Sequence, residues 1–548
     1  MRKQFSSNEG AFPTPAMTGE GLGVGKARYV AHEIPLPLGV EESQLTKTLA
    51  QALRVPEDAL SEVRILRKSL DARARNRPLW RYSLEFGCAA EFRHPKAFRL
   101  KPSGPPRREA APDPLPGPRV AVVGCGPAGM AAALFLARKG YAVTVFEQGR
   151  PVGPRFRDIR LFIKQNRFDA HSNILFGEGG AGTFSDGKLT ARTRNAHTDA
   201  FLRELVACGA EPEILYLHHP HLGTDRLQFV IAAFRRRCEE AGAVFRFETE
   251  VEDLCVENGR CRGLWAAGRE FAFDAVVLAP GLSAHRLYEV AASRGVALER
   301  KGFSLGLRVE HPQAWVNRSR LGEVDTRLTG AAEYFLTFGK GEACAYSFCM
   351  CPGGVVIPCA DRPDALFTNG MSYSNRATPY ANSAVVVPVD VAALPGGVLA
   401  GMEYQVALEK AAFRMGGGSF SFPAQTVSAF LDNRVEGGSA PATSFQKPLR
   451  WGDFSRLFEP AVAQALAEAF RAFEVKMPGF MKNGLLMGPE SRTSSPVRLL
   501  RDPLTLRSVN TEGLYPIGEG AGYAGGIVSS GADGIRLAEA VAPPVRRA

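Results

Sequence analysis

The feature that most constrains the fold of this chain is a single unit at residues 119–147. A valine-rich run at residues 120–123 is followed by the turn Gly-Cys-Gly-Pro-Ala-Gly, by strong helix formers, and by a second β-branched run at residues 143–146. The turn has the spacing Gly-x-Gly-x-x-Gly. Strand, glycine turn, helix and strand in this order predict a βαβ unit of a parallel sheet. We therefore expect an α/β fold built around this unit.

The three glycines of the turn each have a physical purpose. Gly124 permits the tight turn, Gly126 lets the backbone approach a pyrophosphate, and Gly129 lets helix and strand pack closely. The N-terminus of the helix offers free N–H groups and the positive end of the helix dipole. Glu147 ends the second strand, where a carboxylate accepts hydrogen bonds from a ribose and disfavours a 2′-phosphate. The unit predicts a dinucleotide site, but the turn alone does not separate FAD from NAD.

A second glycine-rich turn lies near the C-terminus. A short strand at residues 514–517 leads into Gly-Glu-Gly, three further glycines and a helix expected at residues 532–541. This segment resembles the second FAD motif of the glutathione-reductase-like flavoproteins. The resemblance implies that Glu519 hydrogen-bonds the ribityl chain, a position at which most relatives have Asp. It also implies that the following helix points its N-terminus at the flavin, where reduced flavin gathers negative charge.

Two further segments resemble cofactor-contacting parts of the same superfamily. The strand ending Ala-Pro-Gly at residues 279–281 resembles a strand that ends Ala-Thr-Gly beside FAD, and Val251 falls where relatives hold the adenine. We find no second Gly-x-Gly-x-x-Gly unit and expect no dedicated NAD(P) domain, while transient binding of NAD(P)H stays open. The residues predicted to contact the cofactor, FAD, are Gly124, Gly126, Pro127, Ala128, Gly129, Glu147, Gly179, Gly180, Gly182, Val251, Ala279, Gly281, Gly518, Glu519, Gly525, Gly526 and Ile527.

Four longer strings resemble a single family. They are Gly-Glu-Gly-Gly-Ala-Gly-Thr-Phe-Ser-Asp-Gly-Lys at residues 177–188, Tyr-Ser-Phe-Cys-Met-Cys-Pro-Gly-Gly at 346–354, Thr-Asn-Gly-Met-Ser-Tyr at 368–373 and Ser-Arg-Thr-Ser-Ser-Pro-Val-Arg at 491–498. Together they resemble the uncharacterised FAD-dependent dehydrogenases of bacteria and some plastids, over residues 29–541. Ser491 departs from the family pattern, which has Thr. The resemblance implies FAD and an N-terminal α+β domain, but no substrate.

Three polar residues are candidates for catalysis. By analogy with related flavoproteins, the loop at residues 177–188 would wrap the flavin. Lys188 would then stabilise anionic reduced flavin, and Asp186 would relay a proton. An Asp–Lys surface turn explains these two residues equally well. Arg492 would clamp an anionic substrate by paired hydrogen bonds, with a structural salt bridge as the alternative.

The cysteines and histidines have plainer explanations. Cys349 and Cys351 would share one face of a strand, but their fit to disulfide geometry is poor. We therefore favour core residues over redox thiols for this pair. The histidines at positions 218, 219 and 221 lack a nearby acidic pattern, so we expect no metal site. The ten cysteines form no paired framework and no Cys-x-x-Cys, which favours a reducing compartment.

Charge and hydropathy exclude several classes of protein. The net charge of +11 fits a solvated surface together with sites for an anionic cofactor. The run at residues 120–137 contains no charged residue and has a length typical of a transmembrane helix. The strand and helix on either side of the glycine turn explain this run instead. The N-terminus contains Glu9 and Glu20 and no apolar run, so it is not a secretory signal, while an organellar targeting peptide stays open. We expect a cytoplasmic protein without membrane segments.

The predicted fold class is α/β. We expect a Rossmann-like FAD-binding domain with an inserted mixed α+β cap domain and a small N-terminal α+β domain, ferredoxin-like in type. The predicted divisions are a disordered tail at residues 1–27, the small domain at 28–101, a Pro-rich linker at 102–118, the first part of the FAD-binding domain at 119–300, the cap at 301–487 and the closing part at 488–548.

These features predict an FAD-dependent oxidoreductase that uses hydride transfer at flavin N5 on an unidentified small-molecule substrate. Three alternatives stay open. The Asp533-Gly534 pair resembles a monooxygenase motif, although it lies after the closing turn. Basic residues at positions 64, 67, 68, 73 and 75 would suit an RNA-binding or RNA-modifying protein, although we expect no nucleic-acid partner. A redox-inactive flavin scaffold is the third.

Overall fold

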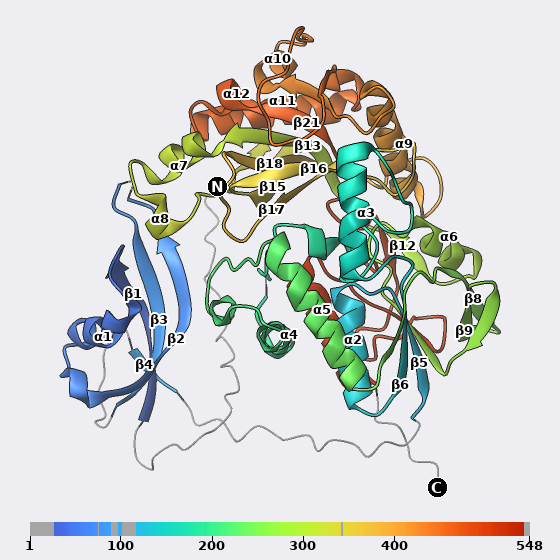
Figure 1. Cartoon of the computed structure of the whole chain (residues 1–548), viewed down its shortest axis with the longest axis horizontal. Helices are drawn as coiled ribbons and strands as arrows, with labels where there is room; N and C mark the ends of the chain where they lie inside the picture. The colour runs from blue at the N-terminus through green and yellow to red at the C-terminus, as the bar shows by residue number, and fades with distance from the viewer. Residues whose placement is uncertain are drawn as a thin grey trace.

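The computed structural model describes residues 27–74, 76–88, 97–100, 117–191, 193–340 and 343–541. Figure 1 shows three groups of elements: a small N-terminal sheet at the left, a parallel sheet with its helices at the lower right, and a large sheet below a layer of helices at the top. The predicted tail and linker lie outside the described residues except for Ala27 and residues 117–118. Ala27 is the first residue of strand β1, so the strand begins inside the expected tail.

The parallel sheet is the predicted Rossmann-like core. Its strand order is β23-β11-β5-β6-β7, and every neighbouring pair is parallel. Residues 120–123 of β5 are buried, as expected for a central parallel strand. Strand β23, near the C-terminus, and strand β5, which begins at residue 119, thus belong to the same sheet. This arrangement confirms the α/β class. The strands are β5 Arg119–Val123, β6 Ala142–Phe146, β7 Val244–Arg246, β11 Ala275–Leu278 and β23 Leu514–Pro516.

Two helices that each follow a glycine turn pack against each other beside this sheet. α2 (Pro127–Arg138) follows β5, and α13 (Ile527–Ala540) follows β23. A Cβ at Gly534 would lie 2.2 Å from the Ala128 carbonyl oxygen, so this contact requires glycine. α13 begins five residues before its expected start, because packing against α2 outweighs the weak helix propensity of its first turn. The other helices here are α3 Val152–Gln165, α4 Ala196–Ala207, α5 Thr224–Glu240 and α6 His285–Ser293.

The large sheet has seven strands in the order β14-β15-β18-β13-β21-β19-β20. Phe470 and Phe473 of α11 and Phe480 of α12 pack in one buried cluster with Leu307 of β13. The strands are β13 Ser304–Pro312, β14 Thr337–Lys340, β15 Ala343–Cys351, β18 Tyr380–Pro388, β19 Pro423–Thr426, β20 Arg450–Trp451 and β21 Leu485–Glu490. The helices are α7 Gln313–Leu321, α8 Thr326–Thr329, α9 Ala400–Met415, α10 Val427–Leu431, α11 Pro460–Lys476 and α12 Phe480–Asn483.

Smaller sheets connect and flank these two. The hairpin β16–β17 lies beside the large sheet, and β12 pairs with β22 where the chain passes between the large and parallel sheets. These strands are β8 Val251–Glu257, β9 Arg260–Ala266, β10 Arg269–Ala272, β12 Leu298–Arg300, β16 Gly354–Cys359, β17 Phe367–Ser372 and β22 Val497–Leu499. Within the described part of the chain, no helix has the length and apolar character needed to cross a membrane.

The N-terminal sheet is antiparallel, with the strand order β2-β3-β1-β4. Helix α1 (Leu45–Leu53) packs Leu49 and Leu53 into the core of this sheet. The second helix of a ferredoxin-like domain would fall at residues 89–96, outside the described residues, so that part of the expectation stays a prediction. The strands are β1 Ala27–Pro37, β2 Leu60–Asp71, β3 Leu79–Cys88 and β4 Ala97–Arg99.

Candidate functional site

The first glycine turn leaves open space at the N-terminus of α2. A Cβ at Gly124, whose φ is +101°, would lie 2.2 Å from the Ala279 carbonyl oxygen. A Cβ at Gly129 would lie 2.0 Å from the Gly124 carbonyl oxygen, so the protein's own packing requires both glycines. At Gly126, by contrast, no described atom lies within 4 Å of a Cβ position, and no described side chain caps α2. This open, uncapped helix end suits a phosphate.

Glu147 is buried directly beside this turn. Its Oε2 accepts a hydrogen bond from the Cys125 backbone N–H at 2.9 Å, and its Oε1 accepts bonds from Gly149 and Gly177, both at 2.9 Å. Because each carboxylate oxygen has more than one acceptor position, Glu147 can fix the turn and still accept a ribose hydroxyl.

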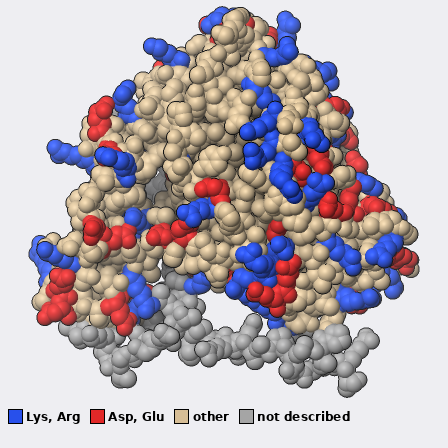
Figure 2. All heavy atoms as spheres, viewed as in Figure 1, with Lys and Arg blue, Asp and Glu red and all other residues tan. Residues whose placement is uncertain are grey.

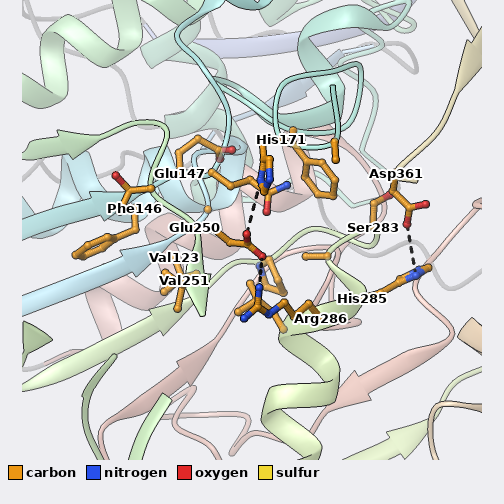
Figure 3. Close-up of a pocket in the computed structure, with 18 of the residues that line it drawn as sticks. Val123, Phe146, Glu147, His171, Glu250, Val251, Ser283, His285, Arg286 and Asp361 are labelled. Atoms are coloured by element: carbon orange, nitrogen blue, oxygen red, sulfur yellow. Dashed lines mark hydrogen bonds and ion pairs between the residues drawn. The ribbon is translucent and has the colours of Figure 1, made fainter. Parts of the chain in front are cut away.

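A cleft of about 220 Å³ opens where β5, β6 and β11 end. Gly124, Glu147 and Val251, three of the predicted cofactor residues, line it together. Ligands of parallel α/β sheets bind at these carboxyl ends of the strands. In Figure 3, Glu250 lies between His171 and Arg286, at 3.6 Å and 3.2 Å.

Sequence reasoning missed several residues that line this cleft. Ser283, His285 and Arg286 follow the Ala-Pro-Gly strand end within five residues, so that motif was a signal that could have identified them. Asp361 and Arg362 come from the segment after β16, and only the tertiary structure brings them here. His285 lies 3.4 Å from Asp361, and its Nε2 has no hydrogen-bond partner within the described structure.

A third loop touches both glycine turns. A Cβ at Gly180, in the short 3₁₀ helix η3 (Gly180–Phe184), would lie 3.2 Å from the Cα of Gly126. A Cβ at Gly182 would lie 3.0 Å from the side chain of Ile527, the first residue of α13. The glycines of η3 therefore keep three chain segments close together. The remaining predicted cofactor residues lie in the same turns or at the end of β11: Pro127, Ala128, Gly179, Ala279, Gly281 and Gly518.

Glu519 lies half-buried in the second glycine turn, and in the described structure its carboxylate makes no hydrogen bond or ion pair, although its backbone carbonyl oxygen accepts a hydrogen bond from the Gly522 N–H at 2.9 Å. Burial raises the pKa of Glu519 to about 7; the charge of Lys301 lowers it and that of Cys349 raises it. At Gly525 and Gly526, no described atom lies within 4 Å of a Cβ position. An acceptor without a partner, next to open backbone, fits the hydroxyl groups of a ribityl chain. The residues of both turns therefore fit FAD.

Three family models match the chain. Residues 302–493 match "FAD-dependent protein, C-terminal domain-like", and residues 122–183 match an NAD(P)-binding Rossmann-like domain. Residues 31–87 match a domain of unknown function. An uncharacterised protein of Clostridium beijerinckii is 36% identical over 529 residues, which cover 93% of this chain and 97% of that protein.

The chain belongs to this family of uncharacterised FAD-dependent proteins. FAD is therefore the cofactor of this FAD-dependent protein, as its sequence predicts. A kynurenine 3-monooxygenase of Salinispora arenicola is 33% identical over 174 residues, covering 30% of this chain and only 36% of that enzyme.

The likeness of this FAD-dependent protein to solved structures is low. The glycine oxidase of Bacillus cereus matches with a TM-score of 0.32 and 12% identity, over 77% of this chain and 94% of that chain. The flavin-dependent brominase Bmp2 matches with a TM-score of 0.37 and 13% identity, over 77% of each chain. Similarity at this level supports no conclusion about the reaction.

The predicted pair Asp186 and Lys188 lies in an ion cluster. Buried Asp186 accepts hydrogen bonds from Lys188 at 2.6 Å, from Arg376 at 2.9 Å and from the Ser372 hydroxyl. Burial opposes ionisation of Asp186, but the charges of Lys188 and Arg376 hold its pKa well below the usual range. Asp186 therefore stays ionised at neutral pH, which argues against the predicted proton relay. Burial also opposes the Lys188 charge, yet neighbouring Cys351 and Asp186 raise the pKa of Lys188.

Arg492, the predicted substrate clamp, lies in buried ion pairs. Its side chain is only 2% exposed. It donates to Glu409 at 2.8 Å and 2.7 Å, and its Nη2 also lies 2.9 Å from Asp361. A guanidinium engaged in this way is not free to grip a substrate in bidentate fashion. These contacts favour the alternative that the sequence left open, a structural salt bridge.

The histidines of residues 218–221 have protein partners. His219 lies 2.6 Å from Glu333, His218 contacts Arg67 at 3.1 Å, and His221 lies 3.2 Å from a backbone oxygen. In the part of the chain that the structure describes, no three His, Cys, Asp or Glu side chains gather as a metal site.

Proposed function

We propose that this FAD-dependent protein is a dehydrogenase or reductase that transfers hydride between FAD and a small organic substrate. The observation that carries the proposal is the position of the Lys188 ammonium. Lys188 follows the glycine loop that touches both cofactor turns, and it donates to Asp186. Asp186 also accepts hydrogen bonds from Ser372 of β17 and from Arg376 of the loop after it. A substrate held between the parallel sheet and the large sheet would lie beside this cation.

The residues of the two turns provide the binding surface. The open helix end at Gly126 would hold the pyrophosphate, Glu147 the ribose of the adenosine and Glu519 the ribityl chain. The uncapped N-terminus of α13 would place its positive dipole end near the flavin. FAD supplies the two-electron chemistry, since its N5 position accepts or donates hydride.

Lys188 would contribute charge rather than a proton. Its ammonium is kept protonated by Asp186, and Arg376 holds Asp186 in place. A fixed cation in a partly buried site stabilises negative charge that develops during the reaction. Asp186 is therefore a positioning residue for Lys188 in this proposal.

Two observations weigh against the alternatives. Asp533 of the Asp-Gly pair accepts hydrogen bonds from Arg501 at 2.7 Å and from the Gly518 backbone at 2.8 Å, which explains that pair by packing. Of the basic residues considered for RNA, Lys68 pairs with Glu42 and Arg73 with Asp71, while residue 75 lies outside the described part. Figure 2 shows basic and acidic side chains interspersed over the visible face rather than one basic surface.

The test uses purified holoprotein and its visible spectrum. Small organic metabolites are screened under anaerobic conditions for bleaching of the flavin, and the reduction potential is measured for the wild type, Lys188→Met and Lys188→Arg. We expect a lower potential in Lys188→Met and a near-normal one in Lys188→Arg, because a cation stabilises reduced flavin. Rapid oxygen consumption with NAD(P)H would instead favour a monooxygenase, and equal potentials in all three proteins would exclude the role of Lys188.

A further inference from the structure

Strand β15 carries a bulge at its two cysteines. Phe348 of β15 pairs with Ala384 of β18, and the next pair is Cys351 with Asn382. The chain therefore advances by three residues on β15 but by only two on β18, which leaves one extra residue on β15. Cys349, with φ +46°, adopts the left-handed conformation that non-glycine residues rarely have. A bulge bends the strand and re-aims its side chains. The regular-strand spacing that made a disulfide improbable therefore does not hold here, and the Cys351 thiol donates a hydrogen bond to the backbone carbonyl oxygen of Cys349 at 3.4 Å.

Cations surround this thiol pair. The Lys188 ammonium lies 3.9 Å from Cys351 Sγ, and fully buried Arg308 donates to the Cys349 carbonyl oxygen at 3.3 Å. A Cβ at Gly370 would lie 2.8 Å from Cys351 Sγ, so only a glycine leaves room for this sulfur. The nearby ion pairs contain one more cation than carboxylate. Their members are Lys188, Arg308 and Arg376 with Asp186 and Glu490.

The two thiols differ in acidity. The neighbouring Cys351 thiol lowers the pKa of Cys349, with help from Lys188 and Arg308 and against the effect of burial. The pKa of Cys351 is raised, first by the neighbouring Cys349 and then by burial. By contrast, burial raises the pKa of Cys125 and of Cys359, as for inert core thiols.

The thiol pair also lies close to the cofactor turns. Lys188 follows η3, whose glycines contact both turns, and the charge of Cys349 acts on Glu519 of the second turn. In Figure 1, β15 belongs to the large sheet, above the parallel sheet that carries these turns. The Lys188 ammonium, 3.9 Å from Cys351 Sγ, thus links the pair to the loop that contacts both turns.

We propose that Cys349 and Cys351 form a redox-active dithiol that exchanges two electrons with FAD, an inference that rests on the proposed oxidoreductase function. In the oxidising direction, the Cys349 thiolate and the Cys351 thiol form one S–S bond, and the S–H bond of Cys351 breaks. The electron pair and the proton pass to oxidised FAD, which is the oxidant and becomes the reduced anion. The reverse step regenerates the thiolate and the thiol.

The test counts electrons in the holoprotein. Wild type, Cys349→Ser, Cys351→Ser and the control Cys344→Ser are oxidised with diamide, desalted and titrated anaerobically with dithionite while flavin absorbance is followed. Cys344 is the matched control because it is an exposed cysteine of the same strand. Wild type and Cys344→Ser should consume four electrons per FAD, and the other two variants only two. Mass spectrometry of the oxidised wild type should show the peptide with Cys349 and Cys351 lighter by two hydrogens.

Two results would overturn the proposal in different ways. If all four proteins consume two electrons per FAD and both thiols of the oxidised wild type still react with iodoacetamide, the dithiol is wrong while the oxidoreductase function stands. If dithionite bleaches no flavin in any of them, the oxidoreductase function fails and the dithiol proposal fails with it. A direct readout accompanies the titration: dithiothreitol should bleach FAD faster in the wild type than in Cys349→Ser.

Discussion

Substitution of Gly126 by Ala should separate FAD binding from folding. The φ of Gly126 is −80°, which alanine adopts without strain, and no described atom lies within 4 Å of its Cβ position. Replacing glycine by alanine at a helix N-cap costs about 0.5–1 kcal/mol of unfolding free energy. The new methyl group would occupy the space assigned to the pyrophosphate. Loss of one hydrogen bond to a charged group, about 1.5–3 kcal/mol, corresponds to FAD binding weakened roughly 10- to 100-fold.

The assay compares two properties of the apoprotein. FAD affinity is measured by titration of flavin fluorescence, and stability by urea unfolding followed by circular dichroism. Gly129→Ala is the contrasting variant, because its Cβ would lie 2.0 Å from a backbone oxygen. That overpacking should cost about 1–3 kcal/mol of stability and reduce both properties. If Gly126→Ala binds FAD as tightly as the wild type, the open space at the N-terminus of α2 is not the phosphate site and the reasoning fails.

Three further predictions concern stability. Because the pKa of Glu519 is raised from 4.5 to about 7, the folded apoprotein should lose unfolding free energy as pH rises through that window, and Glu519→Gln should flatten the decline in urea titrations at each pH. Arg492→Ala leaves Glu409 buried without its cation and removes one of the two arginines paired with Asp361, so it should cost about 3–5 kcal/mol; adding Glu409→Leu should restore part of it, and a purely additive loss would contradict the pairing. Gly534→Ala places a methyl group 2.2 Å from a carbonyl oxygen of α2 and should lower the Tm, whereas an unchanged Tm would mean that α2 and α13 can separate.

The sequence predicted the cofactor-binding core well because its signals are local. Strand, glycine turn and helix are consecutive in the chain, so residues 119–147 identified both the parallel sheet and the turn at Gly126. The closing turn was equally clear, although α13 begins earlier than expected. Helix propensity is a weak signal, and contact with α2 decides where that helix starts.

The surroundings of the reactive side chains were not predictable in this way. The sequence left Arg492 open between a substrate clamp and a structural salt bridge, and only the fold placed Glu409 of α9 against it. Asp186 looked like a proton relay until Arg376, 190 residues later in the chain, was found to hold it ionised. No sequence spacing encodes either partner, since both pairs join segments that meet only in the folded protein.

Taken alone, the sequence determined the α/β class, the FAD turns and the membership of a flavoprotein family, because glycine spacing and hydrophobic pattern act over a few neighbouring residues. The tertiary structure decided which charged groups are paired, which thiol lies beside an ammonium and which carboxylate lacks a partner. Those properties depend on burial and on contacts across a hundred or more residues. Charge pairing and pKa values follow from distance in space, and distance along the chain does not specify them.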